Sequence, residues 1–241
     1  MNDLTIIITM AGMGSRFRKA GYDVPKFMIE AKGKTLFEWS MDSLLDYNNH
    51  VKKYIFIVQK QDNSASFIKE KCQKYGIAAI DVIEINGLTD GQATTCMHAI
   101  SHCDPDSPIL IYNIDTYVEP YEMKYSDISG DGHIPCFNAS GDHWSFVKLN
   151  EKGIATEVTE KIRVSDNCSI GAYYFSSAEL FERTYKEYYS VEQNLVKGEK
   201  YIAPMYNYLI KNGKKVTISM LDQSKVHVLG TPEELEQFQK S

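Results

Sequence analysis

The sequence lacks the features that mark exported, membrane-spanning or disulfide-linked proteins. Its 241 residues include five cysteines, an odd number, and no Cys-x-x-Cys pair, so neither a disulfide framework nor a zinc ribbon is expected. No apolar run approaches membrane-spanning length, and the first residues show no cationic segment followed by a cleavage site. We therefore expect a cytoplasmic protein without a membrane partner.

An excess of positive charge is also missing. Lysine and arginine total 26 against 32 aspartate and glutamate, a net charge of −6, which argues against a nucleic-acid partner. The segment 12–35 differs, because it is rich in cations and poor in acids. The cations are Arg16, Arg18, Lys19, Lys26, Lys32 and Lys34, and the acids are Asp23 and Glu30. A local positive field in an acidic chain favours a small anionic substrate.

Two common phosphate-binding motifs are incomplete near the start of the chain. A dinucleotide-binding Gly-x-Gly-x-x-Gly motif that began at Gly12 would need a glycine at position 17, where this chain has Phe17. A P-loop that ended at residues 33–35 (Gly-Lys-Thr) would need a glycine at position 28, where the chain has Met28. The sequence therefore excludes nicotinamide enzymes and ATPases that use these two loops.

The segment does contain a strand that turns through glycines into a helix. Residues 4–10 are rich in β-branched side chains and predict a buried strand, and residues 12–15 supply two glycines and the start of a short helix. Such a turn points bare backbone N–H groups at one place, where the helix dipole also favours an anion. Arg16 and Lys26 add fixed positive charge, so the segment predicts a cradle for a polyphosphate.

Strand and helix patterns alternate through the first half of the chain. Predicted strands cover residues 4–10, 54–59, 79–85 and 108–114, and predicted helices cover 36–47, 64–75 and 91–102. This order predicts a mostly parallel sheet covered by helices. In the second half, shorter strands are predicted at 136–138, 144–149, 155–159, 171–176, 215–220 and 226–229, with helices at 179–189, at 203–211 and after Thr231. They favour an antiparallel extension within one unit that spans 1–241.

Polar segments follow three of the predicted strands, at residues 12–16, 88–93 and 113–116. In open α/β sheets, ligands bind beyond the carboxyl ends of the strands, so these segments should converge on one edge. Asp115 is the candidate ligand for Mg²⁺, which accepts one or two carboxylates beside substrate phosphates and water; the alternative is an aspartate that caps the next turn. The pair Glu160-Lys161 follows a later strand and is either part of the site or a solvated surface pair.

Residues 10–17 (Met-Ala-Gly-Met-Gly-Ser-Arg-Phe), continued by Pro25-Lys26, resemble the signature of the sugar-phosphate nucleotidylyltransferases. The resemblance covers most of the chain. Residues 89–95 are similar to the family's base-recognition loop, 113–116 to its metal-binding strand end, and 160–161, 171–175 and 229–235 to its later blocks. The short length is similar to bacterial cytidylyl- and uridylyltransferases of capsule and surface-polysaccharide pathways, which include enzymes that activate phosphocholine or phosphoglutamine.

The resemblance implies a Mg²⁺-dependent transfer of a nucleotidyl group. The expected fold is a mostly parallel, Rossmann-like α/β sheet flanked by helices, with a smaller antiparallel extension; residues 1–120 would bind the nucleotide and residues 121–241 the acceptor. The partners would be a nucleoside triphosphate, with CTP favoured, and a phosphorylated small-molecule acceptor, and a homo-oligomer is left open. Pyrophosphate would leave in line, driven by positioning and charge neutralisation.

The resemblance also assigns roles to individual residues. Arg16 would stabilise the leaving pyrophosphate and Lys26 the α-phosphate, while Asp115 would hold Mg²⁺. The residues that would bind the nucleotide are Ala11, Gly12, Met13, Gly14, Ser15, Thr89, Gly91 and Gln92. The residues that would bind the acceptor are Asn113, Glu160, Lys161 and Gly171.

One position departs from the family pattern. The family has a second metal-binding aspartate two residues before the late Gly-Thr pair, where this chain has Val228. Either the second carboxylate is missing or another residue, such as Asp222, supplies it. Two other functions therefore stay open: a glycosyltransferase that consumes a nucleotide sugar, although Tyr117 stands where such enzymes have the second acid of Asp-x-Asp, and a catalytically inactive nucleotide-binding regulator.

Overall fold

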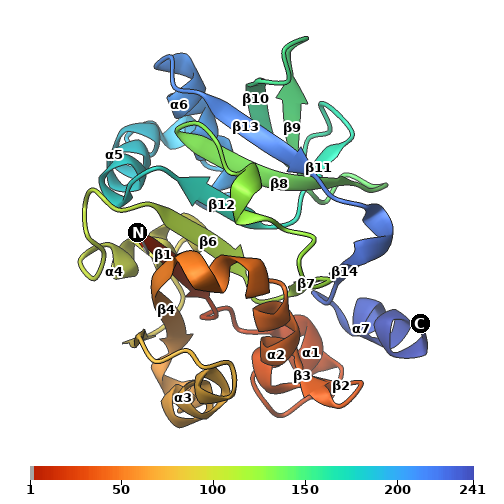
Figure 1. The fold of residues 1–241 in the computed structure, drawn as a ribbon. Coiled ribbons are helices and arrows are strands. Elements are labelled where there is room, and N and C mark those ends of the chain that lie inside the picture. The colour runs from red at the N-terminus through yellow and green to blue at the C-terminus, as the bar shows by residue number, and fades with distance from the viewer. Residues whose placement is uncertain (1–2) are drawn as a thin grey trace.

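One ten-stranded sheet runs through both halves of the chain (Figure 1). The computed structural model describes residues 3–241. The first half contributes four parallel strands in the order β5 (Ile80–Ile85), β4 (Val51–Gln59), β1 (Leu4–Thr9) and β6 (Ile109–Asn113). Because all four are parallel, their carboxyl ends lie at the same edge of the sheet, and the polar segments that follow them meet there.

The second half extends this sheet with antiparallel pairings. The remaining strands are β8 (Gly132–Asn138), β9 (Ser145–Leu149), β10 (Ala155–Glu160), β11 (Asn167–Ser169), β12 (Ala172–Phe175) and β13 (Val216–Met220). Strand β12 runs antiparallel to both β6 and β8, and β11 runs antiparallel to both β8 and β9. Only β10, β11 and β12 oppose the direction of β1, since β13 is parallel to β8. The predicted fold class, a mostly parallel sheet with an antiparallel extension, is confirmed.

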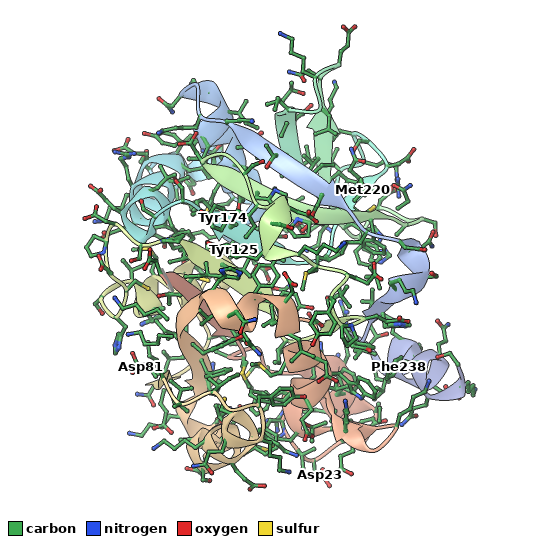
Figure 2. All side chains as sticks on the ribbon, in the orientation of Figure 1. Asp23, Asp81, Tyr125, Tyr174, Met220 and Phe238 are labelled. Atoms are coloured by element: carbon green, nitrogen blue, oxygen red, sulfur yellow. The ribbon has the colours of Figure 1, made fainter. Side chains whose placement is uncertain are left out.

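Helices cover both faces of the sheet because neighbouring strand residues point to opposite sides. On β1, Ile7 belongs to a first core that includes side chains of α4 (Gln92–Ile100), α5 (Ala178–Tyr188) and α6 (Tyr206–Lys211). The next residue, Ile8, belongs to a second core beneath α2 (Leu36–Asp42) and α3 (Ala65–Lys74). Tyr125 and Tyr174 pack against this second core and are labelled in Figure 2.

A third, smaller core joins the two ends of the chain. It contains Phe17, Leu36, Tyr117, Leu235 and Phe238, all less than 9% exposed. The elements around it are α1 (Ser15–Lys19), β2 (Glu30–Ala31), β3 (Lys34–Thr35), β7 (Thr116–Val118), β14 (Val226–Val228) and α7 (Pro232–Lys240). Figure 1 shows α7, in blue, beside the red and orange N-terminal elements. Figure 2 labels Phe238 on this helix, and its ring meets the Trp39 ring edge-on at 5.2 Å.

The predicted helix 36–47 is too long. In the structure α2 ends at Asp42, a 3₁₀ helix follows at η2 (Leu45–His50), and β4 begins at Val51 rather than at Tyr54. Tertiary hydrogen bonds account for the change, because the Val118 N–H donates to Ser43 Oγ and the Tyr125 N–H donates to Asp46 Oδ2. Strands β7 and β11 and the β2–β3 hairpin were not predicted, because these strands are only two or three residues long.

Further short helices complete the described chain. They are the 3₁₀ helices η1 (Lys26–Met28), η3 (Lys60–Asp62), η4 (Tyr125–Asp127), η5 (Glu192–Asn194), η6 (Ala203–Met205) and η7 (Gln223–Lys225). Among residues 3–241, no helix is both long and apolar enough to cross a membrane. All five cysteines are free thiols, and only Cys103 is more than slightly exposed.

Replacing Leu235 by alanine tests the third core. Leu235 is fully buried, so Leu235→Ala should lower the free energy of unfolding by about 2–5 kcal/mol through lost burial and the cavity left behind. Urea denaturation followed by circular dichroism measures the change. Gln237→Ala is the control, because Gln237 is exposed on the same helix and should change stability by less than about 0.5 kcal/mol. Equal stability of the two variants would contradict the packing of α7.

Candidate active site

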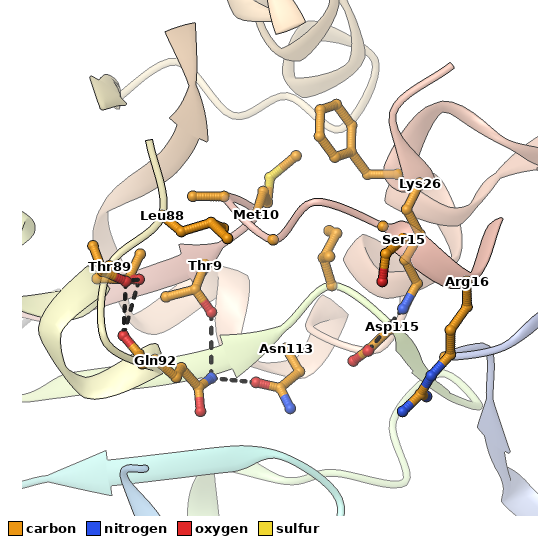
Figure 3. A pocket seen from close by; sticks show the side chains of 18 of the residues that line it. Thr9, Met10, Ser15, Arg16, Lys26, Leu88, Thr89, Gln92, Asn113 and Asp115 are labelled. Carbon is orange, nitrogen blue, oxygen red and sulfur yellow. Dashed lines mark hydrogen bonds and ion pairs between the residues drawn. The ribbon is translucent and has the colours of Figure 1, made fainter. Parts of the chain in front are cut away.

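A cavity of about 500 Å³ opens at the carboxyl edge of the parallel strands (Figure 3). The segments after β1, β5 and β6 all line it, as the sequence predicted. The predicted site residues in its wall are Ala11, Gly12, Gly14, Ser15, Arg16, Lys26, Thr89, Gly91, Gln92, Asn113 and Asp115. The parallel half of the sheet therefore brings most of the predicted residues to one place.

The loop after β1 presents unused backbone donors. Gly14 has φ +57°, a left-handed conformation that glycine adopts readily, and it turns the chain into α1. Within residues 3–241, the N–H groups of residues 12–15 donate no hydrogen bond to a protein acceptor. Because α1 has only five residues, the N–H groups and the cations supply most of the positive potential. Free N–H groups at this edge suit phosphate oxygens.

An ion pair between Lys26 and Asp115 crosses the floor of the cavity. Lys26 Nζ lies 2.8 Å from Asp115 Oδ2, and Figure 3 shows the two side chains pointing toward each other. Burial raises the pKa of the Asp115 carboxyl, but the ammonium of Lys26 and the charge of Arg16 outweigh that effect and hold this pKa below its usual value. Asp115 is therefore ionised at neutral pH.

The late Gly-Thr-Pro block covers this ion pair. Strand β14 pairs with β7, placing Val228 opposite Thr116, and the Leu229 N–H donates to the carbonyl of Asp115. A Cβ atom at Gly230 would lie 3.5 Å from Asp115 Oδ2 and 3.9 Å from Lys26 Nζ. Glycine at position 230 therefore lets the backbone approach the two charged groups.

The segment predicted to recognise the base, residues 89–95, is tied to the strand ends by side-chain amides. Gln92 Nε2 donates to Thr9 Oγ1 and to Asn113 Oδ1 (Figure 3). Gly91 has φ +143°, and a Cβ atom there would lie 2.4 Å from the carbonyl oxygen of Lys200. Only glycine fits at position 91, because a segment from the second half of the chain crosses directly over it.

That crossing segment adds a residue which sequence reasoning missed. The Ala93 N–H donates to the carbonyl of Lys200, and the Lys200 ammonium lies 2.8 Å from the carboxylate of Asp90. The preceding residue, Glu199, lines the cavity. No local signal could have identified Glu199, since it lies more than 100 residues from the loop that it faces.

Three predicted acceptor residues lie outside the cavity wall. Glu160 is buried beside Ser145, whose hydroxyl donates to it, and its other oxygen lies 3.6 Å from Lys161 Nζ. Burial raises the pKa of Glu160 above its usual value, and the nearby Glu199 adds to the rise. Lys161 donates to the hydroxyl of Tyr201. Glu160 and Lys161 are therefore not a solvated surface pair, but neither residue lines the cavity.

The third of these residues, Gly171, supports Asn113 from behind. Gly171 has φ +84°, and a Cβ atom there would lie 2.3 Å from Asn113 Nδ2. The Asn113 N–H also donates to the carbonyl of Gly171. Gly171 therefore positions Asn113, the one predicted acceptor residue that does line the cavity.

Other parts of the basic segment point away from the cavity. Arg18 donates to the carbonyl of Met13. Both residues line a smaller neighbouring pocket, so Met13, a predicted nucleotide-binding residue, lies outside the cavity wall. Lys34 pairs with Asp42 at 2.6 Å, and Lys32 lies over the ring of Phe238. Of the cations counted in the sequence, only Arg16 and Lys26 line the cavity.

Comparison with known structures places this site in a family. The nucleoside-diphosphate-sugar pyrophosphorylase from Vibrio cholerae RC9 is 36% identical and superposes with a TM-score of 0.90, covering 98% of this chain and 100% of that one. The chain belongs to this family of nucleotidyltransferases. The inositol-1-phosphate CTP transferase from T. maritima is 16% identical to this chain. It superposes with a TM-score of 0.73 and covers 95% of this chain and 90% of its own, so the two proteins share a fold.

A shorter match agrees with this assignment. A protein of Encephalitozoon cuniculi (strain GB-M1), described as "Probable UDP-N-acetylglucosamine pyrophosphorylase", is 34% identical over 76 residues, which are 30% of this chain and 20% of that protein. The chain therefore spans about a fifth of that relative. No protein-family model matches the sequence.

The donors at the cavity floor fit Mg²⁺. The described residues contain no group of three or more acidic, histidine or cysteine side chains suited to a metal. Mg²⁺ requires no such group, because one or two carboxylates suffice when phosphates and water complete its octahedron. Asp115 is ionised and lies beside the unused N–H groups that suit phosphates. The site can therefore hold the ion together with a triphosphate.

Exchanging Gly171 for alanine tests the position of Asn113. Gly171→Ala should displace the Asn113 amide and its bond from Gln92, and so weaken nucleoside triphosphate binding about two- to tenfold, the value of one hydrogen bond. Isothermal titration measures the affinity. Gly153→Ala is the matched control, because Gly153 also has a positive φ, +73°, but no atom within 4 Å of the added Cβ. If both variants bind nucleotide equally well, the supporting role of Gly171 is wrong.

Proposed function

We propose that the chain is a Mg²⁺-dependent nucleotidylyltransferase that transfers a nucleoside monophosphate to a phosphorylated small-molecule acceptor and releases pyrophosphate. The observation that carries the proposal is the Lys26–Asp115 pair beneath unused N–H groups at one cavity. A cation, a carboxylate and backbone donors at one point match a triphosphate with its metal ion. The similarity to a nucleoside-diphosphate-sugar pyrophosphorylase supports the same chemistry.

The reaction needs no covalent intermediate with the protein. An acceptor phosphate oxygen attacks the α-phosphorus, and the bond from that phosphorus to the oxygen bridging the β-phosphate breaks, so that pyrophosphate leaves in line. Backbone N–H groups of residues 12–15 hold the phosphates, and Arg16 stabilises charge on the pyrophosphate. Lys26 would bind the α-phosphate, and Asp115 would hold Mg²⁺. When bound, Mg²⁺ neutralises charge on the phosphate oxygens.

The same proposal assigns the two substrates to two parts of the site. Gln92, with backbone groups of Ala11 and Gly91, reads a pyrimidine base, and CTP is the favoured donor. Asn113 and the Glu160-Lys161 pair, together with Glu199, bind the acceptor, which is a sugar phosphate or a small phosphate ester such as phosphocholine or phosphoglutamine. The product would serve the synthesis of capsule or surface-polysaccharide precursors in the cytoplasm.

A glycosyltransferase function is disfavoured by the residue at position 117. Tyr117 lies in the third core, against the ring of Trp39 at 4.8 Å. The position that would carry the second acid of an Asp-x-Asp pair is therefore filled by a packed aromatic ring. An inactive regulator is disfavoured because Arg16, Lys26 and Asp115 all line the cavity.

Pyrophosphate release is the experiment that tests the function. Purified protein with Mg²⁺ is combined with CTP, UTP, dTTP, ATP or GTP and with sugar 1-phosphates, phosphocholine, phosphoglutamine or polyol phosphates. We expect release with one pair, with CTP as donor. Release only with UTP or dTTP would correct the base preference. No release in any pair, while CTP still raises the melting temperature, would support a binding role instead.

Substituting Lys26 tests the mechanism. Lys26→Ala should lower kcat by at least about 10²- to 10³-fold, as loss of one preorganised charge at a transition state does, while the fold survives. Pyrophosphate release with the best substrate pair gives kcat, and circular dichroism gives the fold. Lys19→Ala is the control, since Lys19 is exposed in the same basic segment and does not line the cavity. A fully active Lys26→Ala protein would refute this role.

A further inference from the structure

Position 228, where the family pattern has an aspartate, offers no ligand for a cation. Val228 pairs with Thr116 on β7 and packs against the second core. Its side chain cannot bind a cation. Asp222, the substitute that the sequence offered, is exposed and accepts hydrogen bonds from Ser224 instead. If the proposed function holds, either one carboxylate serves the metal alone or a different residue takes the second place.

Helix α7 begins with a pattern that normally forms a capping box. In Thr-x-x-Glu the threonine accepts from the glutamate N–H, and the glutamate carboxylate accepts from the threonine N–H. Helix α2 forms the whole box with Thr35 and Glu38. Helix α7 forms only half of it, because the Glu234 N–H donates to Thr231 Oγ1 while the Glu234 carboxylate does not return to the Thr231 backbone among the described hydrogen bonds.

One oxygen of the Glu234 carboxylate lies close to Gly230 instead. A Cβ atom built at Gly230 would lie 3.2 Å from Glu234 Oε2 and 3.5 Å from Asp115 Oδ2. Both carboxylate oxygens therefore lie within 3.5 Å of one point, and Lys26 Nζ lies 3.9 Å from the same point. Three charged side chains from distant parts of the chain converge beneath Gly230.

Glu234 Oε2 is buried and has no hydrogen-bond partner among the described residues. A buried carboxylate oxygen without a partner is costly and points to an ion or water that completes its surroundings. Lys26 does not fill this role, since it bonds to Asp115, and no described cation lies within 4.0 Å of the Glu234 carboxylate. The Glu234 carboxylate therefore adds a negative charge next to the Lys26–Asp115 pair that no described cation within 4.0 Å balances, and a divalent cation would balance it.

We propose that Glu234 supplies the second carboxylate of the Mg²⁺ site, next to Asp115, in place of the aspartate that Val228 replaces. The inference rests on the proposed function for its metal ion. Two acidic oxygens are within the ligand number that Mg²⁺ takes from a protein, with phosphates and water as the others.

Binding of Mn²⁺ tests the role of Glu234 without turnover. Mn²⁺ prefers the same oxygen ligands, and electron paramagnetic resonance counts the free ion in the presence of the whole protein, with and without CTP. Glu234→Gln should weaken Mn²⁺ binding about 10- to 100-fold, the usual effect of disturbing a metal site. Mg²⁺ should compete with Mn²⁺ for the wild-type site.

Glu233→Gln is the matched control. Glu233 precedes Glu234 in the first turn of α7 and is exposed, so its change alters net charge and helix dipole equally but leaves the Glu234 carboxylate in place. We expect its Mn²⁺ affinity to stay within about twofold of wild type, because an exposed charge is screened. Equal urea midpoints for the two variants confirm that both fold.

Two outcomes overturn the inference: Mn²⁺ binding by Glu234→Gln that equals wild type, or wild-type protein that binds no Mn²⁺ with or without CTP. In the first case the proposed function still stands if pyrophosphate is released. If instead no substrate pair releases pyrophosphate but Mn²⁺ affinity depends on Glu234, the cation site is supported and the proposed reaction is wrong. The two claims therefore fail separately.

Discussion

The Lys26–Asp115 ion pair is the interaction on which the arrangement of the site depends. Lys26 follows the glycine loop of β1, Asp115 follows β6, and Gly230 lies over both from the start of α7. When one partner of a partly buried charge pair is removed, the other charge is left unpaired and destabilises its surroundings. The segments that carry the two partners therefore depend on one another. The third core, built from Phe17, Tyr117 and residues of α7, holds the same segments together by burial.

The mixed sheet explains why one cavity receives groups from both halves of the chain. Parallel strands bring the ends of β1 and β6 to one edge, where a triphosphate would meet N–H groups and cations. The antiparallel strands continue past β6 and carry Glu160 and Gly171 to the side of that edge. Segment 199–201 then returns across Gly91. Glycines at positions 91, 171 and 230 allow these close approaches.

Sequence reasoning found the cavity-lining residues of the first half of the chain well and those of the second half poorly. The loop after β1, the segment around Gln92 and the end of β6 follow long, periodic strands, so both their structure and their common edge could be predicted. Glu199 was missed because its place depends on the hydrogen bonds that the next residue, Lys200, makes with Asp90 and Ala93, far away in the chain. Helix α2 was drawn too long because its end depends on tertiary bonds to Ser43 and Asp46.

The sequence by itself determined the α/β fold, the glycine loop and the charged residues of the first half that line the cavity, because β-branched runs, helical periods and glycine turns act over a few neighbouring residues. The tertiary structure alone decided which carboxylates lie close to Gly230. In the sequence, Thr231 and Glu234 form the pattern of a capping box, and Val228 stands where the family pattern has a metal-binding aspartate. Docking α7 on the third core placed the carboxylate of Glu234 close to Gly230, on which Asp115 also converges, because burial of Leu235 and Phe238 sets the helix orientation and local hydrogen bonding does not.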